Sequence, residues 1–217
     1  MRARKNNSKK LTVVLLSIIL VLCCTIGGTL AWLQDSTGTV TNTFTVGDVD
    51  IEISETGAEA DGTNLKKETY KIVPGKSESK DPKVTVLANS EKSWVFVEIV
   101  EKDNYIKDGN AYTLDTYIDW SVDTAWTLLS KTPNTDTAGA AEVTYVYYLE
   151  QDATTANVDH YVLSGNSVSY GSDLTKAQLD ALGTTKPTLT FKAYAIQKAN
   201  GNNSEFTVDQ AWTEINK

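Results

Sequence analysis

Few side chains of this 217-residue chain have the chemistry of a catalyst. A zinc hydrolase needs two or three imidazole or carboxylate ligands and a general base, commonly presented as HExxH on a helix. The chain has one histidine, His160, in the sequence VDHYV, and it contains neither HExxH nor a GxSxG nucleophile segment. The residue types therefore predict no catalytic residue, no metal centre and no cofactor, and His160 is interpreted as an ordinary strand or loop side chain.

A cluster of acidic residues, Asp48, Asp50 and Glu52, alternates with apolar residues. Side chains with this spacing lie on one face of a strand. We interpret the cluster as a charged, solvated outer face. Its spacing is not that of an EF-hand, and weak calcium binding is the alternative.

The start of the chain has the layout of a secretory signal. Five basic residues and no acid precede an apolar run at 11–26. The small residues Thr29 and Ala31 stand where a signal peptidase inspects its substrate. We expect residues 1–31 to be removed, which makes Trp32 the first residue of the mature protein. The alternative is an uncleaved anchor, because the apolar run approaches the roughly 20 residues that span a bilayer.

Removal of the signal changes the composition. The mature chain of 186 residues keeps all 28 acids and loses five of the 20 basic residues, so its net charge is near −13. This charge argues against nucleic acid and anionic membranes as partners. Both cysteines, Cys23 and Cys24, are removed as well, so no disulfide is expected. We expect a protein that is secreted, in an extracellular matrix or at the cell surface, and that meets the membrane only through its uncleaved signal.

Apolar residues of the mature chain recur mainly at every second position, and the runs are rich in Val, Ile, Thr and Tyr, which predicts strands. The run at 94–100 is apolar on both faces, which is typical of a strand inside a sandwich. The predicted strands are 43–46 and 49–53 with a bulge at Gly47, 84–86 and 94–100 with a turn between them, 126–129 and 142–149 as a long hairpin, 160–163 and 167–170 as a short hairpin, and 188–196. This pattern predicts an all-β sandwich that forms one domain over 32–217.

Two short segments have helical periodicity instead. The first has a capping box of Thr175 and Gln178. The second, at the C-terminus, has Asp209 as its expected N-cap and places Trp212 on its apolar face. Both helices are interpreted as plugs over the ends of the sheet pair, and the polar segment 55–69 is interpreted as a mobile loop.

The tryptophans of the mature chain point to another class of function. Aromatic rings stack on sugars and on partner side chains, so a monomeric surface binding module is the alternative to a structural protein. Trp94 and Trp126 lie within apolar strands and are interpreted as core residues. Trp120, which lies between acids, and Trp212 are the other candidates for such a platform.

Four segments, taken in order, resemble the TasA/camelysin family of proteins exported by Gram-positive bacteria. They are the junction GGTLAWLQD (27–35), NTFTVGDVDIEIS (42–54), VPGKSESKDPKVTVLANSEKSWVFVEI (73–99), and TLTFKAYAIQ (188–197) with a later AW. Together they span nearly all of the mature chain. The resemblance implies a jelly-roll β-sandwich, a dedicated signal peptidase and a place in the fibres of a biofilm matrix.

The resemblance also implies how such fibres form, namely that the N-terminal segment of one subunit completes the sheet of the next. Here that donor segment is 32–41, WLQDSTGTVT, in which Trp32, Leu33 and Val40 are expected to fill apolar grooves of the neighbour. The implied partners are further copies of the chain or related matrix subunits. The alternative is that residues 32–41 fold back on their own domain.

Camelysin-type relatives are described as metallo-endopeptidases, so the resemblance raises an enzyme as a further function. The ligands that this activity requires are scarce here, because His160 is the one imidazole and both cysteines leave with the signal. An enzyme is therefore not expected.

Overall fold

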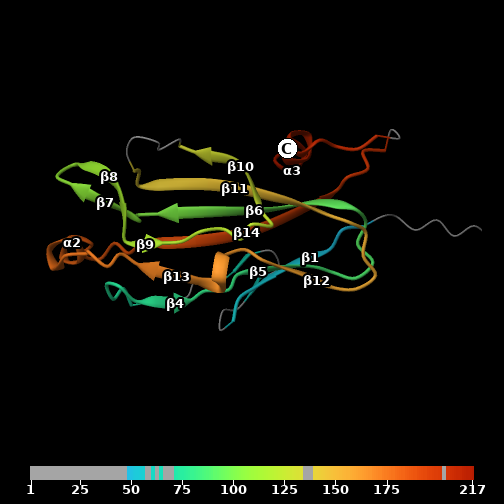
Figure 1. Ribbon diagram of the computed structural model, residues 1–217. Helices are drawn as coiled ribbons and strands as arrows, with labels where there is room; N and C mark the ends of the chain where they lie inside the picture. The colour runs from blue at the N-terminus through green and yellow to red at the C-terminus, as the bar shows by residue number, and fades with distance from the viewer. Residues whose placement is uncertain (1–47, 57–59, 62–63, 66–70, 134–138, 202–203) are drawn as a thin grey trace, which may run out of the picture. The chain divides into compact units, whose positions relative to one another are not determined.

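The computed structural model describes residues 48–56, 60–61, 64–65, 71–133, 139–201 and 204–217. All of them belong to one compact unit that extends from Val46 to Lys217. The described residues form antiparallel strands and two short α-helices (Figure 1). The fold is all-β and sandwich-like, as the twofold periodicity of the sequence predicts.

The largest sheet has six strands, and each neighbouring pair is antiparallel. Its order is β10 (Thr127–Thr132), β11 (Glu142–Gln151), β6 (Ser93–Lys102), β14 (Thr188–Gln197), β3 (Asn64–Leu65) and β2 (Ala60–Asp61). All ten residues of β6 pair with β11 on one side and with β14 on the other. These three long strands are therefore the framework of the fold.

Smaller sheets form the second layer. One contains β1 (Ile51–Ser54), β5 (Lys83–Val86) and β12 (Val158–Tyr161), and another contains β4 (Ser77–Ser79), β13 (Ser167–Tyr170) and β9 (Ile118–Asp119). A separate hairpin consists of β7 (Tyr105–Asp108) and β8 (Ala111–Thr116). In Figure 1 the small sheets lie below the long strands.

The main core lies between these layers. Alternate residues of β6, among them Val95 and Val97, face Val84 and Val86 of β5, and all four are fully buried. Trp126 belongs to the same cluster and is 5% exposed, which confirms its interpretation as a core residue. Burial of this apolar surface, at about 25 cal/mol for each Å², is the main force that holds the layers together.

The opposite face of the long strands is also covered. The helix α3 (Val208–Ile215) packs there, with Phe96 of β6 and Ala211 fully buried. The ring centroid of Trp212 lies 5.1 Å from that of Phe96 and 5.5 Å from that of Tyr194. The two-sided apolar character of 94–100 is thereby confirmed. The prediction that this helix plugs an end of the sandwich is wrong, because its apolar side meets an aromatic patch on the outer face of the sheet.

The long predicted hairpin is confirmed, since β10 and β11 pair directly. The short one is wrong, because β12 pairs with β5, whereas β13 pairs with β4 and β9. Between them a 3₁₀ turn, Ser164–Asn166, contains Gly165 at φ +62° and leads the chain from one small sheet to the other. The turn after β5 likewise leads into another sheet, so β5 and β6 are not hairpin partners.

The helix α2 (Lys176–Ala181) begins at the predicted capping box, in which the Thr175 hydroxyl accepts from Gln178 N and the Gln178 side chain accepts from Thr175 N. The N-cap predicted for α3 is wrong. It is Thr207 and not Asp209, because Thr207 and Gln210 form a second capping box that satisfies two backbone donors at once.

The segment 55–69 is not a loop throughout, since its described parts include β2 and β3 at the edge of the large sheet. The predicted strand 43–46 and the bulge at Gly47 lie outside the described residues. Within the described ranges, neither the length nor the apolar character of any helix suffices to cross a bilayer.

Candidate assembly edge

The predicted cleavage and assembly residues all lie outside the described part of the chain, namely Thr29, Ala31, Trp32, Leu33 and Val40. The structure describes the body to which a strand from another copy would add. Strand addition needs a sheet edge with N–H and C=O groups directed outward. The sheet edges are therefore the candidate sites for such an addition.

One candidate edge is the C-terminal half of β14, beyond its pair with β3, on the side that faces away from β6. Lys198 N donates to Lys92 O at 2.8 Å, and hydrogen-bonded positions recur at every second residue of an antiparallel pair. The even-numbered residues of β14 therefore bond to β6, and Ala195 and Gln197 direct their backbone groups away from it. Among the described residues, β14 is paired on this side at Lys192, with β3.

The strand β1 lies beside β14 and is the edge strand of its own sheet. Leu87 N donates to Asp50 O at 2.9 Å, so the same alternation directs the backbone groups of Ile51 and Ile53 away from β5. The side chain of Ile53 is fully buried in the core. We call the pair of edges formed by β1 and β14 the β1–β14 seam.

A buried ion pair stiffens this seam. Lys80 Nζ lies 2.9 and 3.1 Å from the two carboxylate oxygens of Glu55, which follows β1, and both residues are buried. The same ammonium lies 5.2 Å from the centroid of the Phe191 ring of β14. Loss of either member of a buried ion pair is costly, because it removes a compensating charge from the other. The end of β1 is thus tied to the inner side of β14.

The edge on the other side of the large sheet is less suited to pairing. The register of β10 shifts between Leu128 and Ser130, which marks a bulge, and Pro133 follows the strand directly. A bulge and a proline are both features that keep an edge from adding another strand.

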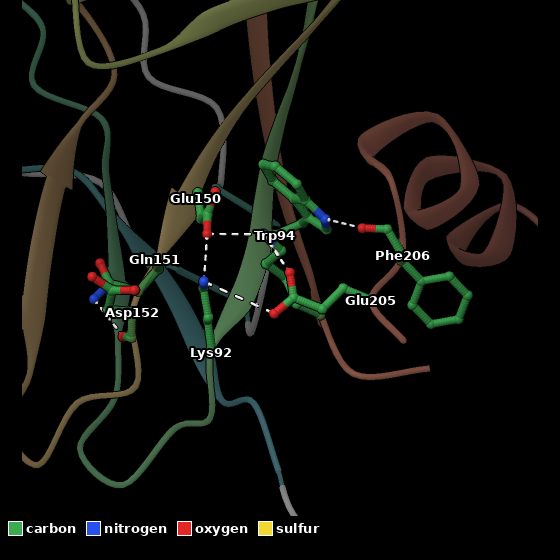
Figure 2. Close-up of polar contacts among 8 residues, drawn as sticks. Lys92, Trp94, Glu150, Gln151, Asp152, Glu205 and Phe206 are labelled. Atoms are coloured by element: carbon green, nitrogen blue, oxygen red, sulfur yellow. Dashed lines mark hydrogen bonds and ion pairs between the residues drawn. The ribbon is translucent and has the colours of Figure 1, made fainter. Parts of the chain in front are cut away.

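Two lysines and two glutamates lie at the end of the sheet where β14 stops (Figure 2). We call Lys92, Glu150, Lys198 and Glu205 the C-terminal clamp. Lys198 Nζ lies 2.8 Å from Glu150 and 3.0 Å from Glu205, and Lys92 Nζ lies 2.9 Å from Glu150. Hydrogen bonds from Lys198 and Lys92 lower the pKa of Glu150, and the bond to Glu150 raises the pKa of each lysine.

The residues next to the clamp anchor the chain before α3 to the long strand β6. Trp94 Nε1 donates to Phe206 O at 2.8 Å, and Phe206 N donates to Lys198 O at the same distance. Lys198 Nζ lies 4.5 Å from the centroid of the Trp94 ring, a cation–π contact. Phe206 and Lys198 are therefore both held beside Trp94 of β6, and Figure 2 shows Phe206 next to the Trp94 indole.

A buried carboxylate lies near the other end of β6. Glu101 is 3% exposed; its Oε1 accepts from Asn104 Nδ2 at 2.5 Å and from Trp120 Nε1 at 2.9 Å, and its Oε2 accepts from Tyr145 at 3.0 Å. Burial, together with the Tyr105 hydroxyl and the Glu101 carboxylate, raises the pKa of Tyr145 well above its usual range. Sequence reasoning missed this cluster. The sequence signal that could have found it is the spacing of Glu101, which lies at the same alternate positions as the inward-facing residues Val97 and Ile99.

The remaining candidates for chemistry are dispersed. His160 lies in β12, half-buried, with its Nε2 2.7 Å from Gln151 Oε1, and burial lowers its pKa although Asp159 opposes that effect. The predicted acidic cluster, Asp48, Asp50 and Glu52, is exposed. Among the residues that the structure describes, no group of three or more His, Cys, Asp or Glu side chains could hold a metal ion.

The four tryptophans in the described part of the chain all contact other residues of the same chain. Trp94, Trp120 and Trp126 donate their indole N–H groups to Phe206 O, Glu101 and Tyr161 O respectively. Trp212 of α3 packs on the sheet, against Phe96 and Tyr194. Their arrangement is that of core and anchoring residues.

No family model matches the chain, and neither the curated proteins nor the solved structures include a match. The class of protein is therefore defined by its own architecture. It is an all-β, sandwich-like protein whose candidate site, in the described part of the chain, is a pair of strand edges.

Proposed function

We propose that the protein is an exported structural subunit of an extracellular matrix, and that copies join by adding their N-terminal segment to the sheet of the next copy. The observation that carries the proposal is the side of β14 that faces away from β6, where backbone groups of Ala195 and Gln197 point outward. The resemblance to the TasA/camelysin family supports it. The partner is another copy or a related matrix subunit.

Strand addition at this edge is physically favourable. An added strand would supply partners for a row of outward N–H and C=O groups, and apolar side chains of the donor would extend the adjoining core. The segment 32–41 has few charges and several Thr and Ser residues, so it can lie extended. Trp32, Leu33 and Val40 are the side chains that we assign to the contact with the neighbour.

The point where this segment joins the domain fits the same proposal. Glu91 N donates to Asp48 O at 3.0 Å, so the chain enters the described body beside the start of β6, next to the end of β14. Six residues separate Thr41 from Asp48, enough to span about 20 Å when extended. A donor segment attached here can reach beyond its own domain.

Signal cleavage would then control assembly. As long as residues 1–31 are attached, the donor segment is held at the membrane by the apolar run. Cleavage after Ala31 frees the amino end at Trp32, and the segment can then add to another copy. Export and the start of assembly would be one event.

The test compares protein that begins at Trp32 with a deletion of 32–41 by negative-stain electron microscopy. The intact mature protein should form filaments, and the deletion should leave folded monomers, because the donor strand is missing. A third version with an extra block of residues ahead of Trp32 should also fail to assemble. Filaments of unchanged abundance from the deletion variant would refute the proposal.

A second variant tests the acceptor edge. Ala195→Pro removes an N–H that points away from β6, so the pairing with β6 keeps its hydrogen bonds while the outer edge loses a donor. Ala195→Val is the matched control, since it adds a side chain of similar size and keeps the N–H. We expect filaments from the valine variant and at least a tenfold loss of filaments from the proline variant.

A further inference from the structure

The strand β12 is the other edge strand of its sheet, and its outward backbone groups could pair with a strand of another copy. A side chain of the same chain covers this edge. Val162 N donates to Pro82 O at 2.8 Å, so alternate residues of this strand bond to β5 and the residues between them, Asp159 and Tyr161, direct their backbone groups outward. Tyr161 is 43% exposed and adds an aromatic side chain next to this edge. An edge of this kind is a template for pairing with a second copy.

The outward carbonyl of Tyr161 has a partner from another part of the chain. Trp126 Nε1 donates to Tyr161 O at 2.9 Å. The Trp126 side chain is almost fully buried, and its ring lies edge-on to His160, with centroids 6.3 Å apart. An indole that is packed on one strand and bonded to its edge occupies the position that a neighbouring strand would need.

The chain around Trp126 extends this cover. Asp123 N donates to Val162 O and Ser164 N donates to Ser121 O, both at 2.9 Å, so 121–123 lies along the chain that follows β12. A turn holds the tryptophan in place, because Trp126 N donates to Asp123 O at 3.0 Å and Ala125 N donates to the Asp123 carboxylate at 3.0 Å.

We propose that Trp126 is an edge guard, which closes β12 against pairing with β12 of a second copy. The partner that it excludes is a second copy of this chain, joined edge to edge in antiparallel fashion. The closure of β12 follows from the contacts that Trp126 makes. That this closure also directs copies to join through the β1–β14 seam rests on the proposed function. Figure 1 shows β12 at the border of the lower layer.

The charged groups beside β12 do not close the edge by themselves. The carboxylate of Asp159 lies 2.8 Å from Lys83 Nζ and accepts from Thr85 Oγ1 at 2.7 Å. A charge that is neutralised by its neighbours repels a second copy weakly, since an exposed ion pair presents little net field. Closure therefore depends on the hydrogen bond and bulk that Trp126 supplies.

The test uses the mature chain that begins at Trp32, with Ala195→Pro present in every sample so that the seam is blocked. Trp126→Phe keeps an aromatic ring on His160 and removes the indole N–H. We expect this double variant to dimerise in sedimentation velocity at about 100 µM, with a dimer fraction at least tenfold above that of Ala195→Pro alone. Adding Tyr161→Pro, which removes an outward N–H from the same edge, should restore the monomer.

The outcome separates the two proposals. If the Trp126→Phe variant is folded and stays monomeric, the proposed role of Trp126 is wrong. This conclusion does not depend on whether the mature protein forms filaments in electron microscopy. Where Trp126→Phe does not fold, Asp123→Ala tests the same point, because it loosens the turn that holds the intact indole, and a monomeric Asp123→Ala variant overturns the guard as well. Circular dichroism and urea unfolding establish that each variant is folded.

Discussion

The side-chain amide of Asn104 forms both of the backbone hydrogen bonds that a neighbouring strand would otherwise make with Ile118. Its side-chain Nδ2 donates to Ile118 O and its Oδ1 accepts from Ile118 N, both at 2.8 Å, so a side-chain amide completes a backbone pair at the start of β9. The same Nδ2 also donates to the buried carboxylate of Glu101. One fully buried side chain thus ties the end of β6 to β9, an edge strand of the second small sheet.

Replacement of Asn104 by alanine should therefore be costly. Asn104→Ala leaves the backbone groups of Ile118 and one oxygen of Glu101 without these partners, and we expect a loss of about 3 kcal/mol in the free energy of unfolding. Urea unfolding followed by circular dichroism measures it. Asn110→Ala, an exposed change in the neighbouring β7–β8 hairpin, is the control and should cost less than about 0.5 kcal/mol. Equal midpoints for the two variants would contradict this assignment.

The C-terminal clamp predicts a loss of stability in acid. The pKa of Glu150 is lower in the folded protein than its value of about 4.3 in unfolded chains, because Lys198 and Lys92 bond to its charged form. Its contribution is present above about pH 4.3 and is lost as the pH falls through the lowered pKa. Urea midpoints of the wild type and Glu150→Gln should differ at pH 7 and converge near pH 3.

The control for this pH dependence is Glu214→Gln. Glu214 pairs with Lys217 on the exposed side of α3, so its removal should change the midpoint little at either pH. Parallel pH profiles for the wild type and Glu150→Gln would show that the clamp does not contribute.

His160 predicts a second pH effect with a different window. Burial lowers its pKa, so the ring in the folded protein takes up its proton at a lower pH than in unfolded chains, where it does so near pH 6.5. Stability is therefore complete above about pH 6.5 and falls as the pH falls toward the lowered pKa. His160 is the one histidine of the chain, which simplifies its assignment. The drop between pH 7 and pH 5 should be absent from His160→Gln, and an identical drop in that variant would assign it to other groups.

Sequence periodicity predicted which residues form the long strands and which of their faces are buried. The run at 94–100 is apolar on both faces, and both faces of β6 are buried, one in the main core and the other against α3, because burial of apolar side chains is a local property of each strand. It did not predict partners. Strands β12 and β13 are separated by a turn that suits a hairpin, yet each has its neighbours elsewhere, because the core satisfies their apolar faces better in different sheets.

The sequence also did not predict the polar contacts of Asn104 and Lys198, because these join residues that are far apart in the chain. Asn104 follows Asp103 in a segment that resembles a turn, and only contacts with Ile118, fourteen residues later, make it a strand partner. Lys198 and Glu150 are 48 residues apart and meet because β6 lies between β14 and β11. Interactions of this range depend on topology, which residue spacing does not contain.

The assignment of Thr207, and not Asp209, as the N-cap of α3 can be tested by substitution. Thr207→Ala removes the hydroxyl that accepts from Gln210 N and should cost about 1 kcal/mol, whereas Asp209→Asn, within the first turn, should cost less than about 0.5 kcal/mol. Since α3 covers Phe96, the loss should also appear as faster hydrogen exchange in Val208–Ile215, while β11 and β14 stay protected. A larger loss of free energy of unfolding from Asp209→Asn than from Thr207→Ala would contradict Thr207 as the N-cap and favour Asp209.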